Sequence, residues 1–193
     1  MSENRRDRLG DAAIRVLAEA GGRGLTHRAV DAAAGLPLGT AKNYHPSRDA
    51  LLRATAERIV EQYERTTAEV MASGAHPVDR RGLAALMAGL LHDVAGPGAP
   101  RMLAYLELQI EAARRPWLAD TLASVVAADF AGFEHAQRAA GLPVTPRRAA
   151  TVTLALHAAI PQLLGGNPRA LASAGLDDLD AFVNGLLDSV YGP

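Results

Sequence analysis

The sequence predicts an all-α protein, and three observations carry this prediction. Alanine and leucine dominate the chain while aromatic residues make up only 4% of its 193 positions, a composition that favours helix. Runs that alternate apolar and polar residues, which are typical of half-buried strands, are absent from the sequence. Glycine- and proline-rich stretches divide the chain into segments of helical length. We therefore expect helices throughout, in a chain long enough to bury a core.

The first helix is expected over residues 5–20. The sequence GGRG at 21–24 ends it, because glycine disfavours helix interiors. Thr26 is a suitable N-cap for a second, short helix through residue 33. Gly35 permits the left-handed conformation that a sharp turn between helices needs.

A third short helix is expected from Pro37 to Tyr44. Proline fits the first helical turn, where its missing N–H is not needed, and Pro46 ends the helix. Ser47 then caps a long fourth helix whose first turn contains Asp49, where the helix dipole favours an acidic side chain.

The rest of the chain is expected to form five more helices, with one short turn in the linker before the last. In the second of these five, Leu103, Leu106, Ile110 and Ala113 are expected to face inward, and the last should have Asp177, Asp178 and Asp180 in its first turn. The main breaks are SGAHP (73–77), GPGAP (96–100) and GLPVTP (141–146). The expected helices cover residues 79–94, 101–115, 116–140, 146–164 and 176–191.

Several classes of protein are disfavoured by composition. The chain has no cysteine, so it has no disulfide and no thiolate metal site. Its charged N-terminal stretch has no secretory signal, and its longest apolar run, 152–164, is too short to span a bilayer. We expect a cytoplasmic protein that needs neither a metal nor a cofactor.

Charge is distributed unevenly along the chain. Residues 1–48 hold eight basic and five acidic residues, a net of +3, whereas the remainder has a net of −4. Such a split favours contact between the N-terminal part and a polyanion, although a surplus this small is also common by chance.

The two short helices expected at 26–33 and 37–44 have helix-turn-helix proportions. In that motif the second helix enters the major groove of DNA. The second segment is largely polar and contains Lys42, the only lysine in the chain. Lys42 can neutralise a phosphate, Asn43 can pair with an adenine edge, and Thr40 can bond a phosphate or touch a thymine methyl. A short helix with a merely solvated polar face fits the periodicity equally well.

The stretch LTHRAVDAAAGLPLGTAKNYHPSRDALL, residues 25–52, resembles the DNA-binding motif of the TetR (tetracycline-repressor-like) family of transcriptional regulators. The resemblance runs from Leu9 to about Leu52. It implies a DNA-binding domain over 1–48 and a helical domain over 49–193 that dimerises and binds a small effector. The implied DNA-binding residues are Thr26, His27, Arg28, Leu38, Gly39, Thr40, Lys42, Asn43, Tyr44 and Arg48.

Two positions depart from the family pattern. Lys42 stands where most members have a phosphate-binding tyrosine, and it can keep that role by charge. His45 stands where most have a core phenylalanine. Both changes bear on the choice of target sequence. Arg28, as well as the N-terminal arginines, could equally be solvated side chains.

The C-terminal part offers a dimer interface and a pocket. The helices at 146–164 and 176–191 carry broad apolar faces that can pair with a second copy, as the resemblance implies, or pack only within the chain. A pocket for a small apolar or amphipathic effector is expected between the middle helices. Its candidate lining residues, any of which can instead be core, are Met87, Leu91, Met102, Leu106, Ile110, Trp117, Phe130, Phe133 and His157.

An enzyme is disfavoured, because the six histidines lack metal-ligand spacing and no nucleophile or phosphate-loop motif occurs. No residue is assigned a catalytic role. The expected function is a DNA-binding regulator, a repressor that its effector releases from a palindromic operator. The alternative is a helical ligand-binding or interaction protein that does not bind DNA.

Overall fold

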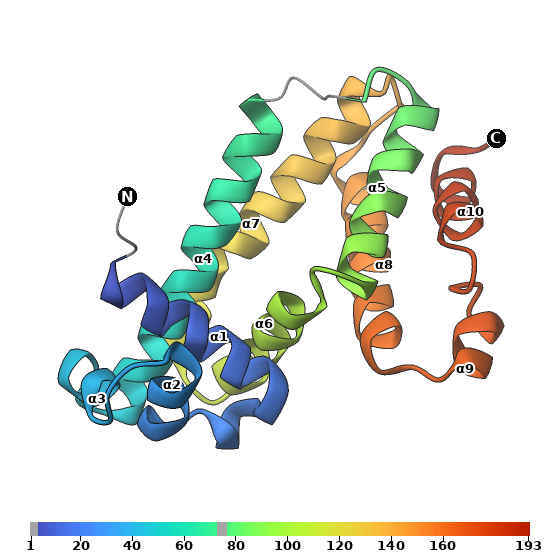
Figure 1. The fold of residues 1–193 in the computed structure, drawn as a ribbon. Helices are drawn as coiled ribbons and strands as arrows, with labels where there is room; N and C mark the ends of the chain where they lie inside the picture. The colour runs from blue at the N-terminus through green and yellow to red at the C-terminus, as the bar shows by residue number, and fades with distance from the viewer. Residues whose placement is uncertain (1–3, 73–76) are drawn as a thin grey trace. The chain divides into compact units, whose positions relative to one another are not determined.

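The computed structural model describes residues 4–72 and 77–193, which form ten helices and no strand (Figure 1). The prediction of an all-α fold is therefore confirmed. The expected break at 73–77 falls mostly on residues 73–76, which lie outside the described residues.

Helix α1 spans Arg5–Gly24 and is interrupted where the sequence predicts its end. Gly21 has φ 63° and ψ −176°, outside the helical region, so the regular helix stops there and one further turn follows. Asn4 caps the beginning of α1, with its side chain accepting a hydrogen bond from the Arg6 amide. The interruption leaves the backbone of Gly22 available to bond elsewhere in the fold.

Helix α2 spans His27–Ala34, which confirms the predicted cap at Thr26 and turn at Gly35 and extends one residue beyond the predicted end at residue 33. The Thr26 side chain accepts a hydrogen bond from the Ala29 amide, and Gly35 adopts the left-handed conformation with φ 61°. The local capping chemistry was thus enough to place this helix.

Helix α3 spans only Thr40–Tyr44, so the expected start at Pro37 is wrong. Pro37 lies in a turn, with its carbonyl accepting the Thr40 amide at 3.1 Å. Gly39 follows with φ 91°, a left-handed conformation that a helix interior does not allow,. This glycine sets the beginning of α3.

The long fourth helix begins as predicted. Helix α4 spans Arg48–Ala72, and the Ser47 hydroxyl caps it by accepting the Ala50 amide at 3.0 Å. Helix α5 likewise has a side-chain cap, Asp79, which accepts the Gly82 amide. The remaining helices are α5 (Arg80–Ala95), α6 (Ala99–Ala112), α7 (Pro116–Ala139), α8 (Pro146–Gly165), α9 (Pro168–Ser173) and α10 (Leu179–Tyr191).

The beginning of α10 and the buried face of α6 differ from expectation. Helix α10 begins at Leu179 because the Asp178 side chain caps it by accepting the Ala181 amide at 2.9 Å. On α6, Ala104 and Leu108 are fully buried whereas Ile110 is 55% exposed. The inward face of α6 is therefore set by residues 104 and 108. The expected inward positions of Leu103, Ile110 and Ala113 are wrong, because Leu103 is also exposed and Ala113 is exposed beyond the end of α6.

The described chain packs as two compact units, each with its own core. Unit 1 comprises residues 1–69 and 100–125, and unit 2 comprises residues 70–99 and 126–193. These units reflect packing, whereas the predicted functional division at residue 48 remains a prediction. The core of unit 1 brings α1–α4 together with α6 and the first part of α7 through Leu9, Leu17, Leu25, Val30, Leu51, Leu52, Ile59, Leu108, Leu118 and Leu122.

The core of unit 2 is formed by α5, α8 and α10. Leu83 and Met87 of α5, Val152 of α8, and Val183 and Leu187 of α10 are all fully buried. The apolar stripe of α10 is therefore used within its own unit, while Phe182, Leu186 and Val190 pack at the edge of that core.

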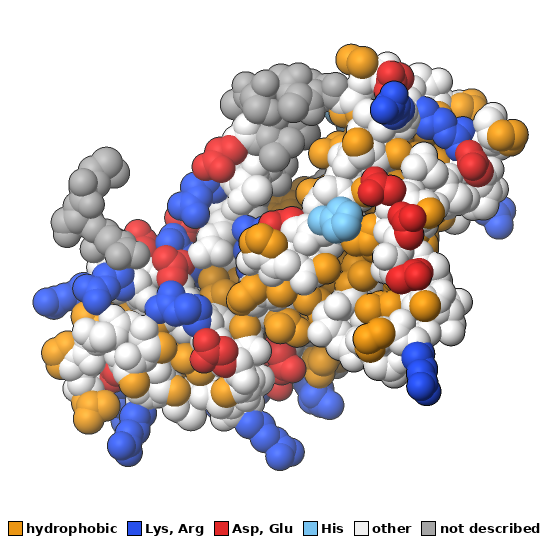
Figure 2. All heavy atoms as spheres, turned by 45° about the vertical axis from the view of Figure 1, so that its right-hand side comes forward, with side chains coloured by type: hydrophobic (Ala, Val, Ile, Leu, Met, Phe, Trp, Pro, Cys, Tyr) orange, Lys and Arg blue, Asp and Glu red, His pale blue; other side chains and the backbone are white. Residues whose placement is uncertain are grey.

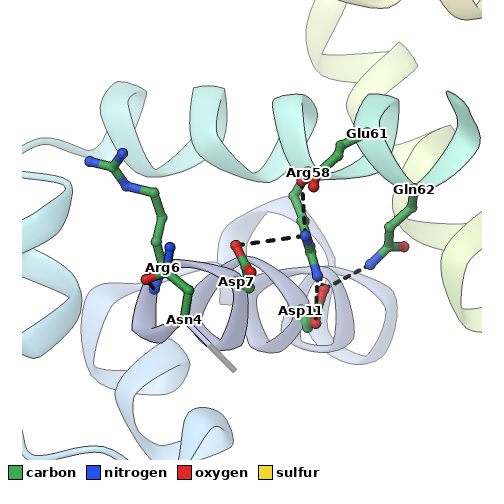
Figure 3. Close-up of polar contacts among 7 residues, drawn as sticks. All are labelled: Asn4, Arg6, Asp7, Asp11, Arg58, Glu61 and Gln62. Carbon is green, nitrogen blue, oxygen red and sulfur yellow. Dashed lines mark hydrogen bonds and ion pairs between the residues drawn. The ribbon is translucent and has the colours of Figure 1, made fainter. Parts of the chain in front are cut away.

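Arg58 of α4 forms a polar bridge to α1 within unit 1 (Figure 3). Its guanidinium donates two hydrogen bonds to Asp11, at 2.7 and 3.0 Å, and one to Glu61 at 2.8 Å. A β-carbon at Gly10 would lie 2.8 Å from Arg58 Cγ, so glycine gives the arginine room to cross α1. The hydrogen bonds to Asp11 raise the pKa of Arg58 above its ordinary value.

We expect Arg58→Ala to lower the free energy of unfolding by about 2 kcal/mol, because it leaves the part-buried Asp11 carboxylate without its main partner. Urea denaturation followed by circular dichroism measures this effect. Arg138→Ala is the control, because Arg138 pairs with Glu134 on an exposed helix surface, where a pair contributes only about 0.4 kcal/mol. Equal destabilisation of the two variants would contradict the structural role of the Arg58 bridge.

Candidate nucleic-acid interface

Asp31 of α2 determines the position of α3. Its side chain is 1% exposed, and its two carboxylate oxygens accept the amides of Gly39 and Ala41, each at 2.7 Å. The N-cap residue of α3 is Gly39, which has no side chain to supply this bond. Asp31 therefore caps α3 from the preceding helix, and its negative charge lies at the favourable end of the α3 dipole.

Several residues of α3 and of the turn before it are open to solvent. Ala41 is fully buried against the core, whereas Lys42 and Asn43 are exposed. Tyr44 is 39% exposed, and Leu38, in the turn before the helix, is 74% exposed. These residues, which the family resemblance implies contact DNA, are thus all accessible to solvent, and a cation and an amide are neighbours in the sequence of α3.

Four other predicted residues are engaged inside unit 1. Thr26 caps α2, and a ring nitrogen of His27 lies 2.6 Å from the His45 carbonyl oxygen. The Thr40 hydroxyl donates to the Pro37 carbonyl at 2.6 Å. The Arg48 guanidinium donates to the carbonyls of Leu25, at 2.6 Å, and Gly22. Arg28 is exposed at the beginning of α2. The contacts of all five residues with DNA remain predictions.

Two arginines of α1 hold the end of α2, which the sequence did not indicate. Arg8 donates to the Ala34 carbonyl at 2.8 Å, and Arg15 donates to the Ala33 carbonyl at 2.9 Å. Carbonyls in the last turn of a helix lack helical partners, and cations are favoured there. Figure 2 shows basic side chains at the surface near the N-terminal end of the chain. The contacts of Arg8 and Arg15 with the end of α2 show that positive charge in this part of the chain also has a structural role.

His45 occupies a buried position at the end of α3, with 8% of its surface exposed. Burial lowers the pKa of its imidazole, and the nearby charges of Arg6 and His27 lower it further. The neutral form is therefore favoured, which suits a side chain at a position where the family pattern has an apolar ring.

A groove in unit 1 was not anticipated from sequence. It has a volume of about 750 Å³ and lies along α1 and α4, with Trp117 at one side and the Arg53 guanidinium 4.2 Å from the centre of its ring. Three arginines and four carboxylates line it, so its charges nearly balance. The lining offers no clear preference for an anion.

The candidate effector residues are divided between the two units. Met102, Leu106, Ile110 and Trp117 belong to unit 1, whereas Met87, Leu91, Phe130, Phe133 and His157 belong to unit 2. Met87 and Leu91 are buried in the unit 2 core. Phe130 meets the His157 ring edge-on at 5.9 Å, and His157 Nε2 lies 3.5 Å from Asp129 Oδ2. A pocket lined by both groups remains a prediction.

Two negative findings apply to the described residues, 4–72 and 77–193. None of their His, Asp and Glu side chains gather into a group that could hold a metal ion. None of their helices is long and apolar enough to cross a membrane.

The chain is similar to known proteins in sequence and in fold. A family model described as the tetracyclin repressor-like C-terminal domain matches residues 78–189, more than half of the chain. No curated protein matches the sequence.

Three solved structures illustrate the likeness in fold. The multidrug binding protein EbrR, complexed with ethidium, is 27% identical over 97% of this chain and 99% of its own, with a TM-score of 0.67. A TetR family member from Streptomyces coelicolor A3 is 26% identical over 98% and 99%, with a TM-score of 0.67. A transcriptional regulator from Rhodococcus sp. Rha1 is 21% identical over 97% and 98%, with a TM-score of 0.72.

We expect Asp31→Asn to loosen α3. The amide keeps one acceptor oxygen but turns its NH2 group toward a backbone N–H, so one hydrogen bond is broken and two donors face each other. Amide hydrogen exchange measured by NMR should be about tenfold faster at Gly39 and Ala41, which corresponds to one broken hydrogen bond. Asp11→Asn, whose carboxylate pairs with side chains of α4, should leave exchange at both amides unchanged. Unaltered protection in Asp31→Asn would contradict the capping role.

We expect His45→Phe to make the protein less sensitive to acid. The folded-state pKa of His45 is lowered from the ordinary value of 6.5, so below that pH the unfolded chain binds more protons and stability falls. Phenylalanine removes this contribution. The decrease in Tm between pH 7.5 and pH 5.5 should therefore be smaller in the variant than in the wild type. Equal decreases would show that burial of His45 does not contribute to acid sensitivity.

Proposed function

The chain belongs to the tetracycline-repressor-like (TetR) family of transcriptional regulators, and from this membership we propose that it binds a palindromic DNA operator as a homodimer. Each subunit would insert α3 into the major groove of one half-site. The observation that carries the proposal is the exposure of Leu38, Lys42 and Asn43 at a short helix whose N-terminal end is capped by a buried carboxylate.

The chemistry of this surface suits DNA. Lys42 brings a cation to the groove edge, where it neutralises a phosphate. Asn43 presents an amide that can donate and accept at an adenine edge. Arg28 lies at the beginning of α2, where it can reach the phosphate backbone, and the α2 N-terminus, with Thr26 and His27, faces the same partner. Gly39, Thr40, Tyr44 and Arg48 complete the proposed interface.

Dimerisation is proposed through residues 146–164 and 176–191. Leu154 of α8 is 57% exposed, and Phe182, Leu186 and Val190 of α10 are only partly buried at the edge of the unit 2 core. Apolar groups in these positions can be covered by a second copy. A dimer also supplies the two half-site contacts that useful operator affinity requires.

The proposed effector is a small apolar or amphipathic molecule bound within residues 49–193. EbrR is a multidrug binding protein whose structure holds ethidium, an aromatic cation. The Phe130, His157 and Asp129 side chains place an aromatic ring beside a carboxylate in unit 2, a combination that suits such a ligand.

Effector binding would favour a distance between the DNA-binding domains of the two subunits, residues 1–48 of each, that no longer matches the spacing of the operator half-sites. This population shift would release the DNA, and operator and effector would weaken each other's binding reciprocally. The protein would then act as a cytoplasmic repressor rather than an enzyme.

Binding to a duplex from the region upstream of its own gene, measured by fluorescence anisotropy across a salt series, tests the proposal. The wild type should bind tightly with a steep salt dependence. Lys42→Ala should weaken binding to all sequences and reduce the slope of log K against log salt by about 0.9 for each phosphate that is no longer neutralised. Asn43→Ala should instead relax the preference at one base pair by about 1–3 kcal/mol.

Arg81→Ala provides a control with the same change of charge, because Arg81 is exposed on α5 in unit 2, outside the proposed dimer interface; its slope should equal that of the wild type. Weak, salt-insensitive binding by the wild type to this duplex and to a random-sequence pool would overturn the proposed function. It would favour a helical ligand-binding or interaction protein instead. A relaxed base preference in Lys42→Ala would contradict the phosphate assignment alone.

A further inference from the structure

Leu38 is an apolar side chain presented outward beside polar neighbours. It is 74% exposed, and it lies in the turn directly before α3. Lys42 and Asn43, which are exposed on the helix that follows, are both hydrogen-bonding groups. Single exposed leucines are common on protein surfaces, so exposure alone does not indicate a role.

The backbone around Leu38 is held in one conformation. The ring of Pro37 fixes the φ angle of that residue, directly before Leu38. The Pro37 carbonyl accepts hydrogen bonds from the amide and the hydroxyl of Thr40, at 3.1 and 2.6 Å. On the other side, the Gly39 amide donates to Asp31 at 2.7 Å. Leu38 is thus presented on a rigid turn, so ordering of the backbone adds little to the free-energy cost of binding through it.

Two side chains close to Leu38 in the sequence are less accessible than Leu38. The Thr40 hydroxyl donates to the Pro37 carbonyl, and Thr40 is half-buried. The Ala41 methyl group is fully buried in the core of unit 1. Leu38 is therefore the large apolar side chain most available for contact near the beginning of α3.

We propose that Leu38 reads the C5-methyl group of a thymine in each operator half-site. In the major groove, thymine carries this methyl beside its O4 acceptor, while the other three standard bases present only polar groups and ring edges. Leucine cannot hydrogen-bond, so its contact with a thymine methyl removes apolar surface from water at both partners. Opposite a cytosine or adenine amino group, the same side chain would cover a donor without bonding it. The inference rests on the proposed operator binding and assigns one base class within it.

Deoxyuridine differs from thymidine only by this methyl group, which gives a direct test. The probe is the duplex best bound in a selection from a random-sequence pool, with each thymine replaced in turn by deoxyuridine. Wild-type affinity should fall about fourfold at one thymine per half-site, as expected for one methyl group taken out of water. With Leu38→Ala, the thymine and uracil duplexes should bind equally at that position.

Two controls keep the test specific. Leu38→Ala removes a mostly exposed side chain, so its Tm should match that of the wild type. Val78→Ala trims another exposed apolar residue, 84% exposed in unit 2, and should retain the fourfold effect. If no thymine responds, or if the response persists in Leu38→Ala, the inference is overturned while operator binding stands. If the selection enriches no duplex, the proposed function fails and the inference fails with it.

Discussion

The candidate DNA-reading surface depends on a buried carboxylate, because α3 is too short to form alone. Helices below about 12 residues are marginal in water, and α3 has five. Asp31 accepts the amide of its N-cap residue and one of its first helical amides, neither of which has a partner within the helix,. Burying that charge is favourable here because two backbone donors and the helix dipole face it. The order of α3 is thus supplied by α2, and the direction in which Lys42 and Asn43 project is fixed by a residue that does not face solvent.

Helix α2 is in turn held by side chains that bond its backbone ends. Arg8 and Arg15 of α1 occupy the carbonyls of its last turn, and Arg48 of α4 occupies the carbonyl of Leu25 just before it. The basic side chains of residues 1–48 therefore fall into two groups. Some arginines hold helices together through carbonyls, whereas Lys42 and Arg28 remain exposed. Net charge alone could not separate these groups, because both count equally in the sum.

The sequence predicted several helix ends that depend on neighbouring residues and missed the contacts that depend on distant ones. Thr26, Gly35 and Ser47 act at their own helix ends, so residue type was enough to place these caps. Asp31 bonds residues eight and ten positions away, and Arg58 reaches Asp11 across 47 positions, where no periodicity applies. The inward face of α6 was misjudged because apolar residues occur on both sides of that helix, and the small Ala104 helps to mark the buried side.

A second carboxylate holds the junction between α1 and α2 in a comparable way. Gly21 leaves the helical conformation, and the Gly22 amide donates to Glu107 of α6 at 2.9 Å. The Gly22 carbonyl accepts from Arg48 at the beginning of α4, so the backbone of one residue is bonded to two other helices of unit 1. A shift of α6 must either carry Gly22 with it or leave its amide without an acceptor, which costs about 1–3 kcal/mol. Because Arg48 also bonds the Leu25 carbonyl, two residues before α2 begins at His27, the position of α2 follows from the same polar contacts that hold α6.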